Sequence, residues 1–249
     1  MKLFPAVSMG VLFLHGAGIF LAAETKPRGA FPGFVALSPE QRAAVADVPG
    51  APGLPRVLLI GDSIAIAYTQ QVRAELKGAA NVHHPDENCG PSAYGVERLD
   101  AWLGGGKWAV VYFNFGLHDL KWLDAGENYV TPNKGKQVAT PEQYGKNLRA
   151  VVQRLQRTGA KLIFATTTPV PAGSTGRVEG SERAYNDVAR RVMEETHVAI
   201  DDLHAIALPR LAEIQLPQNV HFTPAGSGAL ARHVAATIRA ALTPENRPP

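Results

Sequence analysis

The sequence predicts a three-layer α/β/α domain built on a mostly parallel sheet of five strands. Apolar runs alternate with amphipathic helical stretches from Arg56 to Leu242. The runs lack the polar alternation of a half-solvated strand, which is typical of strands buried on both faces and therefore of parallel sheets covered by helices. Their alternation with helices implies right-handed crossover connections.

The first strand starts at Arg56 and ends in Gly61-Asp62-Ser63. The pattern then becomes helical up to about Lys77. Ser63 therefore lies at a strand-to-helix turn, where free backbone N–H groups and the positive end of the helix dipole favour a developing negative charge. Asp and Ser are also preferred helix N-caps, so the same turn allows a purely structural interpretation.

The other elements follow from the same patterns. A polar segment over residues 121–140 has little periodicity and is predicted to be a loop. The last helix has a clear start because Thr223 suits the N-cap and Pro224 the first helical position. We predict the remaining strands at residues 81–85, 108–115, 161–166 and 198–200, and the remaining helices at residues 141–159, 181–196 and 224–242.

The N-terminus has the layout of a secretory signal peptide, with a short basic start, an apolar stretch and small residues up to Ala23. We therefore expect a secreted or periplasmic protein. An uncleaved anchor is the alternative, but Pro5 and His15 suit a spanning helix poorly. We divide the chain into a signal peptide (residues 1–23), a linker or lead-in rich in Pro, Gly and Ala (24–54), the folded domain (55–243) and a C-terminal tail (244–249).

Composition narrows the possible partners. Cys89 is the single cysteine, so no internal disulfide forms. The formal net charge is only +3, and basic and acidic residues are mixed throughout. Neither nucleic acid nor an anionic membrane surface is therefore expected as a partner.

Ligands of parallel α/β sheets bind beyond the carboxyl ends of the strands. A serine there becomes a nucleophile when a general base takes its proton and N–H donors stabilise the oxyanion. Ser63 can supply the hydroxyl and its own N–H, and Gly90 is a natural second donor because a backbone without a side chain lets the substrate approach closely. The histidines at the predicted strand ends are His118, His204 and His221.

Four blocks in order now stand at predicted strand ends: Gly61-Asp62-Ser63, Gly90, Gly116-Leu117-His118-Asp119, and residues 220–226 around His221. With these blocks the chain resembles the SGNH, or GDSL-type, hydrolase family over about residues 56–242. The resemblance implies a flavodoxin-like sandwich, Ser63 as nucleophile, His221 as general base, and the N–H groups of Ser63 and Gly90 in the oxyanion hole. It implies no cofactor and no metal.

Two positions depart from the family pattern. The third block normally reads Gly-x-Asn-Asp, with the Asn as an oxyanion donor, and here His118 occupies the Asn position. An imidazole N–H can replace that donor, or His118 can simply brace Asp119. The last block normally reads Asp-x-x-His, and here Gln218, followed by Asn219, stands at the Asp position. Either a backbone carbonyl or the Gln218 side chain orients His221, or an acid such as Asp201, Asp202 or Glu213 arrives from elsewhere.

The resemblance implies a serine esterase, with Asp62, Asp119 and Gln218 supporting Ser63 and His221. Removal of acetyl groups from polysaccharides or oligosaccharides is common among exported members, so we expect an O-acyl, first of all O-acetyl, ester of a carbohydrate as substrate. A small-ester or lipid esterase, a non-catalytic carbohydrate-binding protein and transfer of the acyl group to a second sugar are alternatives. A metal-dependent phosphoesterase using residues such as Asp201, Asp202 and His204 would leave the serine unexplained.

Overall fold

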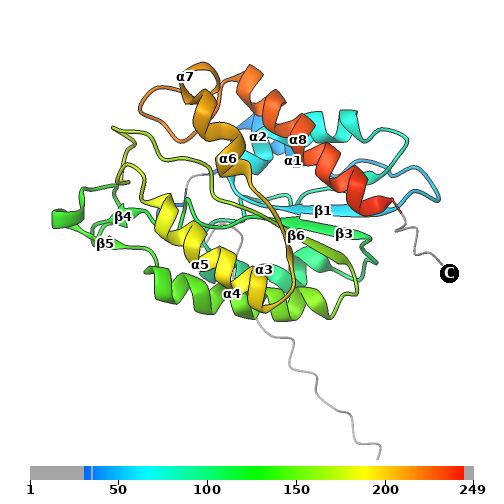
Figure 1. Cartoon of the computed structure of the whole chain (residues 1–249), viewed down its shortest axis with the longest axis horizontal. Helices are drawn as coiled ribbons and strands as arrows, with labels where there is room; N and C mark the ends of the chain where they lie inside the picture. The colour runs from blue at the N-terminus through cyan, green and yellow to red at the C-terminus, as the bar shows by residue number, and fades with distance from the viewer. Residues whose placement is uncertain (1–30, 35, 244–249) are drawn as a thin grey trace, which may run out of the picture.

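Five parallel strands form the central sheet in the order β2-β1-β3-β6-β7 (Figure 1). The computed structural model describes residues 31–34 and 36–243, so the predicted signal peptide and the predicted C-terminal tail lie outside the described residues. This strand order is the flavodoxin-like order, and the predicted fold class is confirmed. The strands are β1 (Arg56–Ile60), β2 (Asn81–His83), β3 (Val110–Phe113), β6 (Lys161–Ala165) and β7 (Ala199–Asp201).

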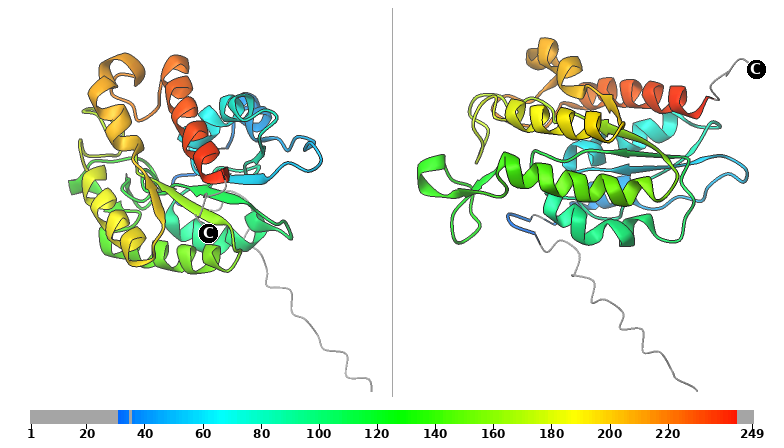
Figure 2. Two further views of the ribbon diagram at one scale, coloured as in Figure 1. Left: turned by 45° about the vertical axis from the view of Figure 1, so that its right-hand side comes forward. Right: turned by 60° about the horizontal axis from the view of Figure 1, so that its bottom comes forward.

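Helices cover both faces of this sheet, as Figures 1 and 2 show. On one face α2 packs against α8 and α1; on the other, α4 packs against both α3 and α5. The central strands β1 and β3 are almost completely buried, which explains their continuous apolar sequence. The helix bounds are α1 Pro39–Val45, α2 Ser63–Glu75, α3 Ser92–Leu103, α4 Pro141–Gln156, α5 Glu182–Glu195 and α8 Pro224–Leu242.

Helix α3 is an element that the sequence analysis did not predict. Its N-cap position is Pro91, which makes no side-chain cap hydrogen bond, so the usual start signal is missing. Its buried stripe includes Arg98 between Tyr94 and Trp102, and a charged residue at this spacing masks the apolar period. All three side chains donate hydrogen bonds to the buried carboxylate of Glu87.

The predicted loop over residues 121–140 contains a small antiparallel hairpin. Its strands are β4 (Trp122–Leu123) and β5 (Lys136–Gln137), with a short 3-10 helix at Pro132–Lys134. The hairpin projects at the end of the molecule where the sheet strands finish (Figure 1). Two-residue strands are too short to produce a readable period in the sequence. A group of short helices, α6 (Leu203–Ala207), η2 (Leu208–Arg210) and α7 (Leu211–Ile214), stands at the same end.

The described part of the predicted lead-in is packed onto the domain. Phe31 is 5% exposed and belongs to the main hydrophobic core. Helix α1 begins with a capping box between Ser38 and Gln41 and packs against α2, where the Arg73 Nη1 donates to the carbonyl of Ala44. The described residues of the predicted linker or lead-in are therefore packed against the folded domain.

Across residues 31–34 and 36–243, none of the helices has both the length and the hydropathy that a bilayer crossing requires.

Candidate active site

The side chains of Ser63 and His221 meet at the carboxyl end of the sheet. Ser63 is the first residue of α2, directly after β1 and the turn at Gly61, where a Cβ would lie 2.5 Å from that of Ala65. His221 precedes α8, whose start is fixed by the side chain of Thr223 accepting a hydrogen bond from Gly226 N. Ser63 Oγ lies 2.8 Å from His221 Nε2. Two helix starts thus place a hydroxyl and an imidazole within hydrogen-bond distance.

The side chain of Asn219 orients this imidazole. Its Oδ1 lies 3.0 Å from the backbone N of His221 and 2.7 Å from His221 Nδ1. Because a backbone N–H only donates, the amide atom facing it is the oxygen, and the same oxygen accepts a hydrogen bond from the Nδ1–H of His221. Neutral His221 therefore carries its proton on Nδ1 and presents the lone pair of Nε2 to Ser63, which is the tautomer that a general base needs.

Gln218, which the family pattern placed in this supporting role, lies away from the imidazole. Its side chain is exposed and packs beside Gly173, where an added Cβ would come within 2.8 Å of Gln218 Cγ. Gln218 has a left-handed backbone, with φ of +55°, and this tight turn brings the next residue to His221. The structure therefore corrects the orienting residue from Gln218 to Asn219.

The three acids that the sequence offered to His221 are occupied elsewhere. Asp201 accepts hydrogen bonds from Tyr112 and His233, Asp202 pairs with Arg190, and Glu213 pairs with Arg210. His204 is likewise held by Glu182, 2.9 Å from its Nε2. Within the described ranges, no three His, Cys, Asp or Glu side chains form a group suited to a metal ion.

His118 lies in the same pocket as Ser63, and Lys121 fixes its tautomer. Lys121 Nζ lies 3.0 Å from His118 Nδ1, and a charged ammonium only donates, so Nδ1 accepts and the proton of neutral His118 is on Nε2. Burial, then the nearby cations Lys121 and Arg177, lower the pKa of His118 well below its usual value. His118 thus offers a neutral Nε2–H donor, and its ring makes no hydrogen bond to Asp119.

Gly90 has a structural partner for its N–H. The N–H donates to Asn88 Oδ1 at 2.9 Å, and Gly90 has φ of +58°. The ring of Phe31 fills the space that a side chain would need, since an added Cβ would lie 2.8 Å from it. Because the Gly90 N–H already donates to Asn88, it is not a free oxyanion donor, which corrects the role expected for it.

Asn88 takes a place in the pocket that the sequence analysis did not assign. Its Oδ1 faces a backbone N–H, so its Nδ2 is the remaining donor, and the residue lines the pocket with Ser63 and His118. The preceding residue, Glu87, anchors this loop: it accepts from Tyr94 Oη at 2.6 Å and from Trp102 Nε1 at 2.6 Å. A signal was present in the sequence, because Asn88 stands two residues before the second family block.

The two predicted supporting carboxylates brace the backbone around the site. Asp62 caps α2 by accepting from Ile64 N at 2.9 Å, and burial raises its pKa against the effect of His221. Asp119 is fully buried and accepts from both the N–H and the hydroxyl of Ser92, at the start of α3. Burial raises the pKa of Asp119 to about 7, although the bonds from Ser92 oppose this.

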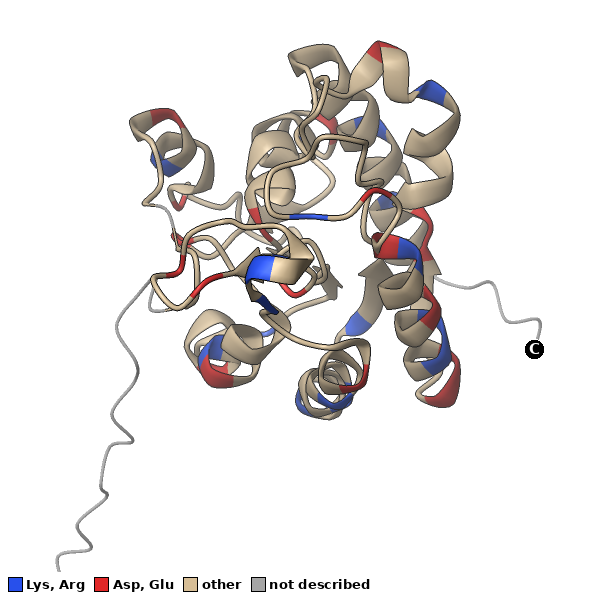
Figure 3. Ribbon diagram, turned by 90° about the vertical axis from the view of Figure 1, so that its left-hand side faces the viewer, with Lys and Arg blue, Asp and Glu red and all other residues tan. Residues whose placement is uncertain are grey.

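Ser63 and His221 open into a pocket of about 240 Å³. Figure 3 looks onto this end of the molecule, where acidic and basic residues are interspersed over the loops. Tyr129 and Arg177 line the pocket, and both come from loops after strands β4 and β6. Trp122, in strand β4 of the hairpin after His118, is not among the residues that line this pocket. The complete lining is Gly33, Ala36, Leu37, Gln41, Ser63, Asn88, His118, Tyr129, Arg177 and His221.

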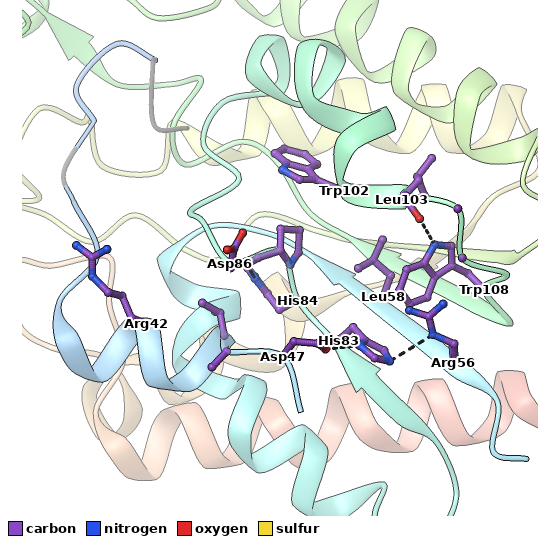
Figure 4. A pocket seen from close by; sticks show the side chains of 16 residues that line it. Arg42, Asp47, Arg56, Leu58, His83, His84, Asp86, Trp102, Leu103 and Trp108 are labelled. Carbon is purple, nitrogen blue, oxygen red and sulfur yellow. Dashed lines mark hydrogen bonds and ion pairs between the residues drawn. The ribbon is translucent and has the colours of Figure 1, made fainter. Parts of the chain in front are cut away.

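A larger hollow of about 670 Å³ lies beside strand β2, between α1 and the end of α3 (Figure 4). Figure 4 shows His83 bridging Asp47 and Arg56, and the Arg56 guanidinium lies 4.1 Å from the centre of the Trp108 ring. No residue lines both this hollow and the Ser63 pocket.

The fold and the Ser63–His221 pair define a serine ester hydrolase. Residues 59–229 match the GDSL-like Lipase/Acylhydrolase family, and the chain belongs to this family. A GDSL esterase/lipase of Arabidopsis thaliana is 26% identical over 128 residues, which cover 43% of this chain and 53% of the relative. The match thus spans about half the length of that relative. The predicted family and enzyme class are confirmed.

Solved structures share the fold. An acetyl xylan esterase, AlAXEase, has a TM-score of 0.60 and 18% identity, covering 74% of this chain and 99% of that one. The lipase/acylhydrolase from Enterococcus faecalis has a TM-score of 0.62 and 17% identity, covering 78% and 100%. Axe2, an acetylxylan esterase from Geobacillus stearothermophilus, has a TM-score of 0.58 and 18% identity, covering 74% and 94%.

Proposed function

We propose that this chain is an exported serine esterase that removes O-acetyl groups from carbohydrate through an acyl-enzyme. The observation that carries the proposal is the hydrogen-bonded series Ser63 Oγ, His221 Nε2, His221 Nδ1 and Asn219 Oδ1, with links of 2.8 and 2.7 Å. This is the arrangement of nucleophile, base and orienting group that activates a serine.

In the acylation step Ser63 Oγ attacks the ester carbonyl carbon while His221 Nε2 takes the hydroxyl proton. The tetrahedral intermediate then collapses, the bond to the sugar oxygen breaks, and His221 returns the proton to that oxygen. Asn219 keeps Nε2 directed at Ser63 and accepts from the imidazolium that forms. In the second step water, deprotonated by His221, attacks the acyl-serine, which releases acetate and restores the Ser63 hydroxyl.

The charge that develops on the carbonyl oxygen is stabilised by N–H donors around Ser63. The Ser63 N–H lies in the first turn of α2, where helical N–H groups have no intrahelical acceptor. His118 Nε2–H and Asn88 Nδ2–H line the same pocket. Hydrogen-bond donors held in place before the reaction act without a reorganisation cost, so each is effective in the transition state.

Pocket size favours a short acyl group. A volume of about 240 Å³ is below the roughly 300–1,000 Å³ of sites that enclose drug-sized ligands, so the pocket suits an acetyl group better than a long alkyl chain. Tyr129 at the rim offers an aromatic face with a hydroxyl, a surface suited to a sugar. The two acetylxylan esterases among the structures of similar fold are in keeping with this substrate class. The predicted signal peptide supports export.

The substrate class is tested by comparing acyl chain lengths and acyl carriers on the mature protein. We expect kcat/KM to be highest for 4-nitrophenyl acetate, to fall steeply for the octanoate and palmitate esters, and acetate to be released from acetylated xylo-oligosaccharides. Faster turnover of the long-chain esters would contradict the acetyl assignment and favour the lipid esterase. Binding of unmodified glycan without turnover of any ester would favour the non-catalytic alternative.

The lowered pKa of the general base His221 predicts how the activity depends on pH. Burial lowers the pKa of His221 and Arg177 lowers it further, while Asp62 opposes both. A base with a lowered pKa stays neutral to lower pH, so the midpoint of the acid limb of the pH profile of kcat/KM should lie below pH 6.5.

Two substitutions of Asn219 test its part in this pH profile. Asn219→Asp adds a carboxylate that stabilises the imidazolium, so the midpoint of the acid limb should shift to higher pH. Asn219→Ala should lower kcat about tenfold, the equivalent of one lost hydrogen bond.

Gln218→Ala is the matched control for these Asn219 variants, because it removes the neighbouring amide without touching His221. We expect its pH profile and kcat to equal those of the wild type. A loss of activity in Gln218→Ala, with wild-type behaviour of Asn219→Ala, would return the orienting role to Gln218.

A further inference from the structure

The pocket at Ser63 is lined by a basic residue without an acidic one to balance it. Arg177 is the only charged residue among its ten lining residues, and none of them is acidic. A neutral acetyl ester gives no reason for a cation beside the nucleophile. An arginine in such a position either pairs with a protein carboxylate or is available to a ligand.

Arg177 pairs with carbonyl oxygens and not with a carboxylate. Its Nε donates to the carbonyl of Leu117 at 3.0 Å and its Nη1 to that of Thr175 at 3.2 Å. These two contacts fix the plane of the guanidinium, and its centre lies 5.9 Å from the ring centre of Tyr129. Among residues 31–34 and 36–243, no carboxylate forms an ion pair with Arg177, and the side chain of Tyr129 is a further polar neighbour of its guanidinium.

A second cation lies behind it. Lys121 is 1% exposed, and its Nζ lies 5.1 Å from the centre of the same Tyr129 ring. Its polar contacts within the described chain are His118 Nδ1 at 3.0 Å and the carbonyl of Gly33 at 3.4 Å, so it too lacks a carboxylate partner. Burial and the positive charge of Arg177 lower the pKa of Lys121 to about 7.

The negative charge of Asp62 raises the pKa of both Arg177 and Lys121, but Asp62 does not contact either group. The Asp62 carboxylate is 2% exposed and accepts from Ile64 N as the N-cap of α2. It forms no ion pair with either cation in the described structure. Arg177 therefore carries a positive charge at the wall of the pocket with no carboxylate of the described chain in contact. A charge taken out of water in this way is stabilised when an anion compensates it.

We propose that Arg177, backed by Lys121, forms a subsite for a carboxylate that the sugar carries beside the scissile ester, so that the substrate is an O-acetylated acidic glycan. This inference rests on the proposed function for the position of the ester. Because Arg177, Ser63 and His221 line one pocket, the anion and the acetyl group would lie on the same or adjacent sugar units. Arginine suits this role because its planar donors match the oxygens of a carboxylate.

The test compares three O-acetylated sugars that differ at one carbon: a uronate, the neutral sugar in which its carboxyl is reduced to CH2OH, and the 6-sulfate of that neutral sugar. A hydrogen bond to a charged group contributes about 1.5–3 kcal/mol, so we expect kcat/KM to be about 10- to 100-fold higher for the uronate than for the neutral sugar. Arg177→Gln should abolish this ratio, and Arg183→Gln, a change at an exposed arginine, should preserve it.

Equal kcat/KM for the uronate and the neutral ester in the wild type would overturn the subsite, as would an unchanged ratio in Arg177→Gln. A higher kcat/KM for the sulfate than for the uronate would overturn the assignment to a carboxylate.

A binding experiment distinguishes a failure of this proposal from a failure of the esterase proposal. If the wild type hydrolyses neither the sugars nor 4-nitrophenyl acetate, the esterase proposal fails. Calorimetric titration of Ser63→Ala with oligogalacturonate and with neutral xylo-oligosaccharide then still tests the subsite: tighter, Arg177-dependent binding of the acidic oligomer supports it, and equal binding overturns it.

Discussion

Replacing Ser63 by alanine should reduce the hydrolysis of 4-nitrophenyl acetate by at least about 10³-fold, because no other group in the pocket can form the acyl-enzyme. Ser63 Oγ is the atom that His221 Nε2 contacts, at 2.8 Å. The measurement is kcat/KM of purified mature wild type and Ser63→Ala, combined with mass spectrometry after treatment with a serine-reactive phosphonate. The wild type should gain the mass of one adduct and Ser63→Ala none.

Ser181→Ala provides the matched control for this substitution. The Ser181 hydroxyl is buried, and it has no hydrogen-bond partner in the described part of the chain, so its removal breaks no hydrogen bond. We expect wild-type activity and one phosphonate adduct in Ser181→Ala, and an unchanged rate of the wild type in the presence of a chelator. Substantial activity in Ser63→Ala, or its loss on chelation in the wild type, would contradict the serine mechanism.

His118→Phe should lower kcat about 10²- to 10³-fold, the loss measured when one oxyanion donor is removed from a hydrolase. Phenylalanine keeps the ring that packs edge-on against Phe31, at 5.4 Å between ring centres, but has no N–H. Because the oxyanion forms only in the transition state, KM should change little while kcat falls. The measurement is steady-state kinetics on 4-nitrophenyl acetate, with a thermal unfolding curve to verify that the variant is folded.

Two further variants separate a donor role from a structural one. His118→Asn restores an N–H donor of the kind the family usually places here, and we expect it to recover most of the lost kcat. Lys121→Met removes the group that holds the proton on His118 Nε2, so kcat should fall by less than in His118→Phe, again with little change in KM. Equal kcat for His118→Phe and the wild type would show that His118 only packs in the pocket.

The order of secondary structure could be predicted because its signals are local. The uninterrupted apolar run before Gly61 and the capped start at Thr223 gave β1 and α8, and both elements lie where expected. Helix α3 and the β4–β5 hairpin were missed for the opposite reason. Arg98 in the buried stripe of α3 pairs with Glu87, a residue outside the helix, and the two-residue strands pair with each other.

Some residues of the site could likewise be predicted from the sequence, and others could not. Ser63 and His221 stand next to helix starts, so their positions could be predicted from the family blocks and the strand ends. Asn219 could not be chosen over Gln218, because the choice depends on the left-handed backbone at Gln218. The partner of the Gly90 N–H could not be predicted for a related reason, since it depends on the Asn88 side chain folding back onto that N–H.

The sequence alone determined the parallel α/β fold, the family and the serine and histidine at the strand ends, since these depend on periodicity and on short motifs along the chain. Only the tertiary structure decided which groups act on those two residues. The tautomers of His221 and His118 follow from contacts with Asn219 and Lys121. The positive charge beside Ser63 comes from Arg177, on a loop more than a hundred residues further along the chain. Such contacts depend on loop conformation and on distances between segments far apart in the chain, and neither leaves a periodic signal in the sequence.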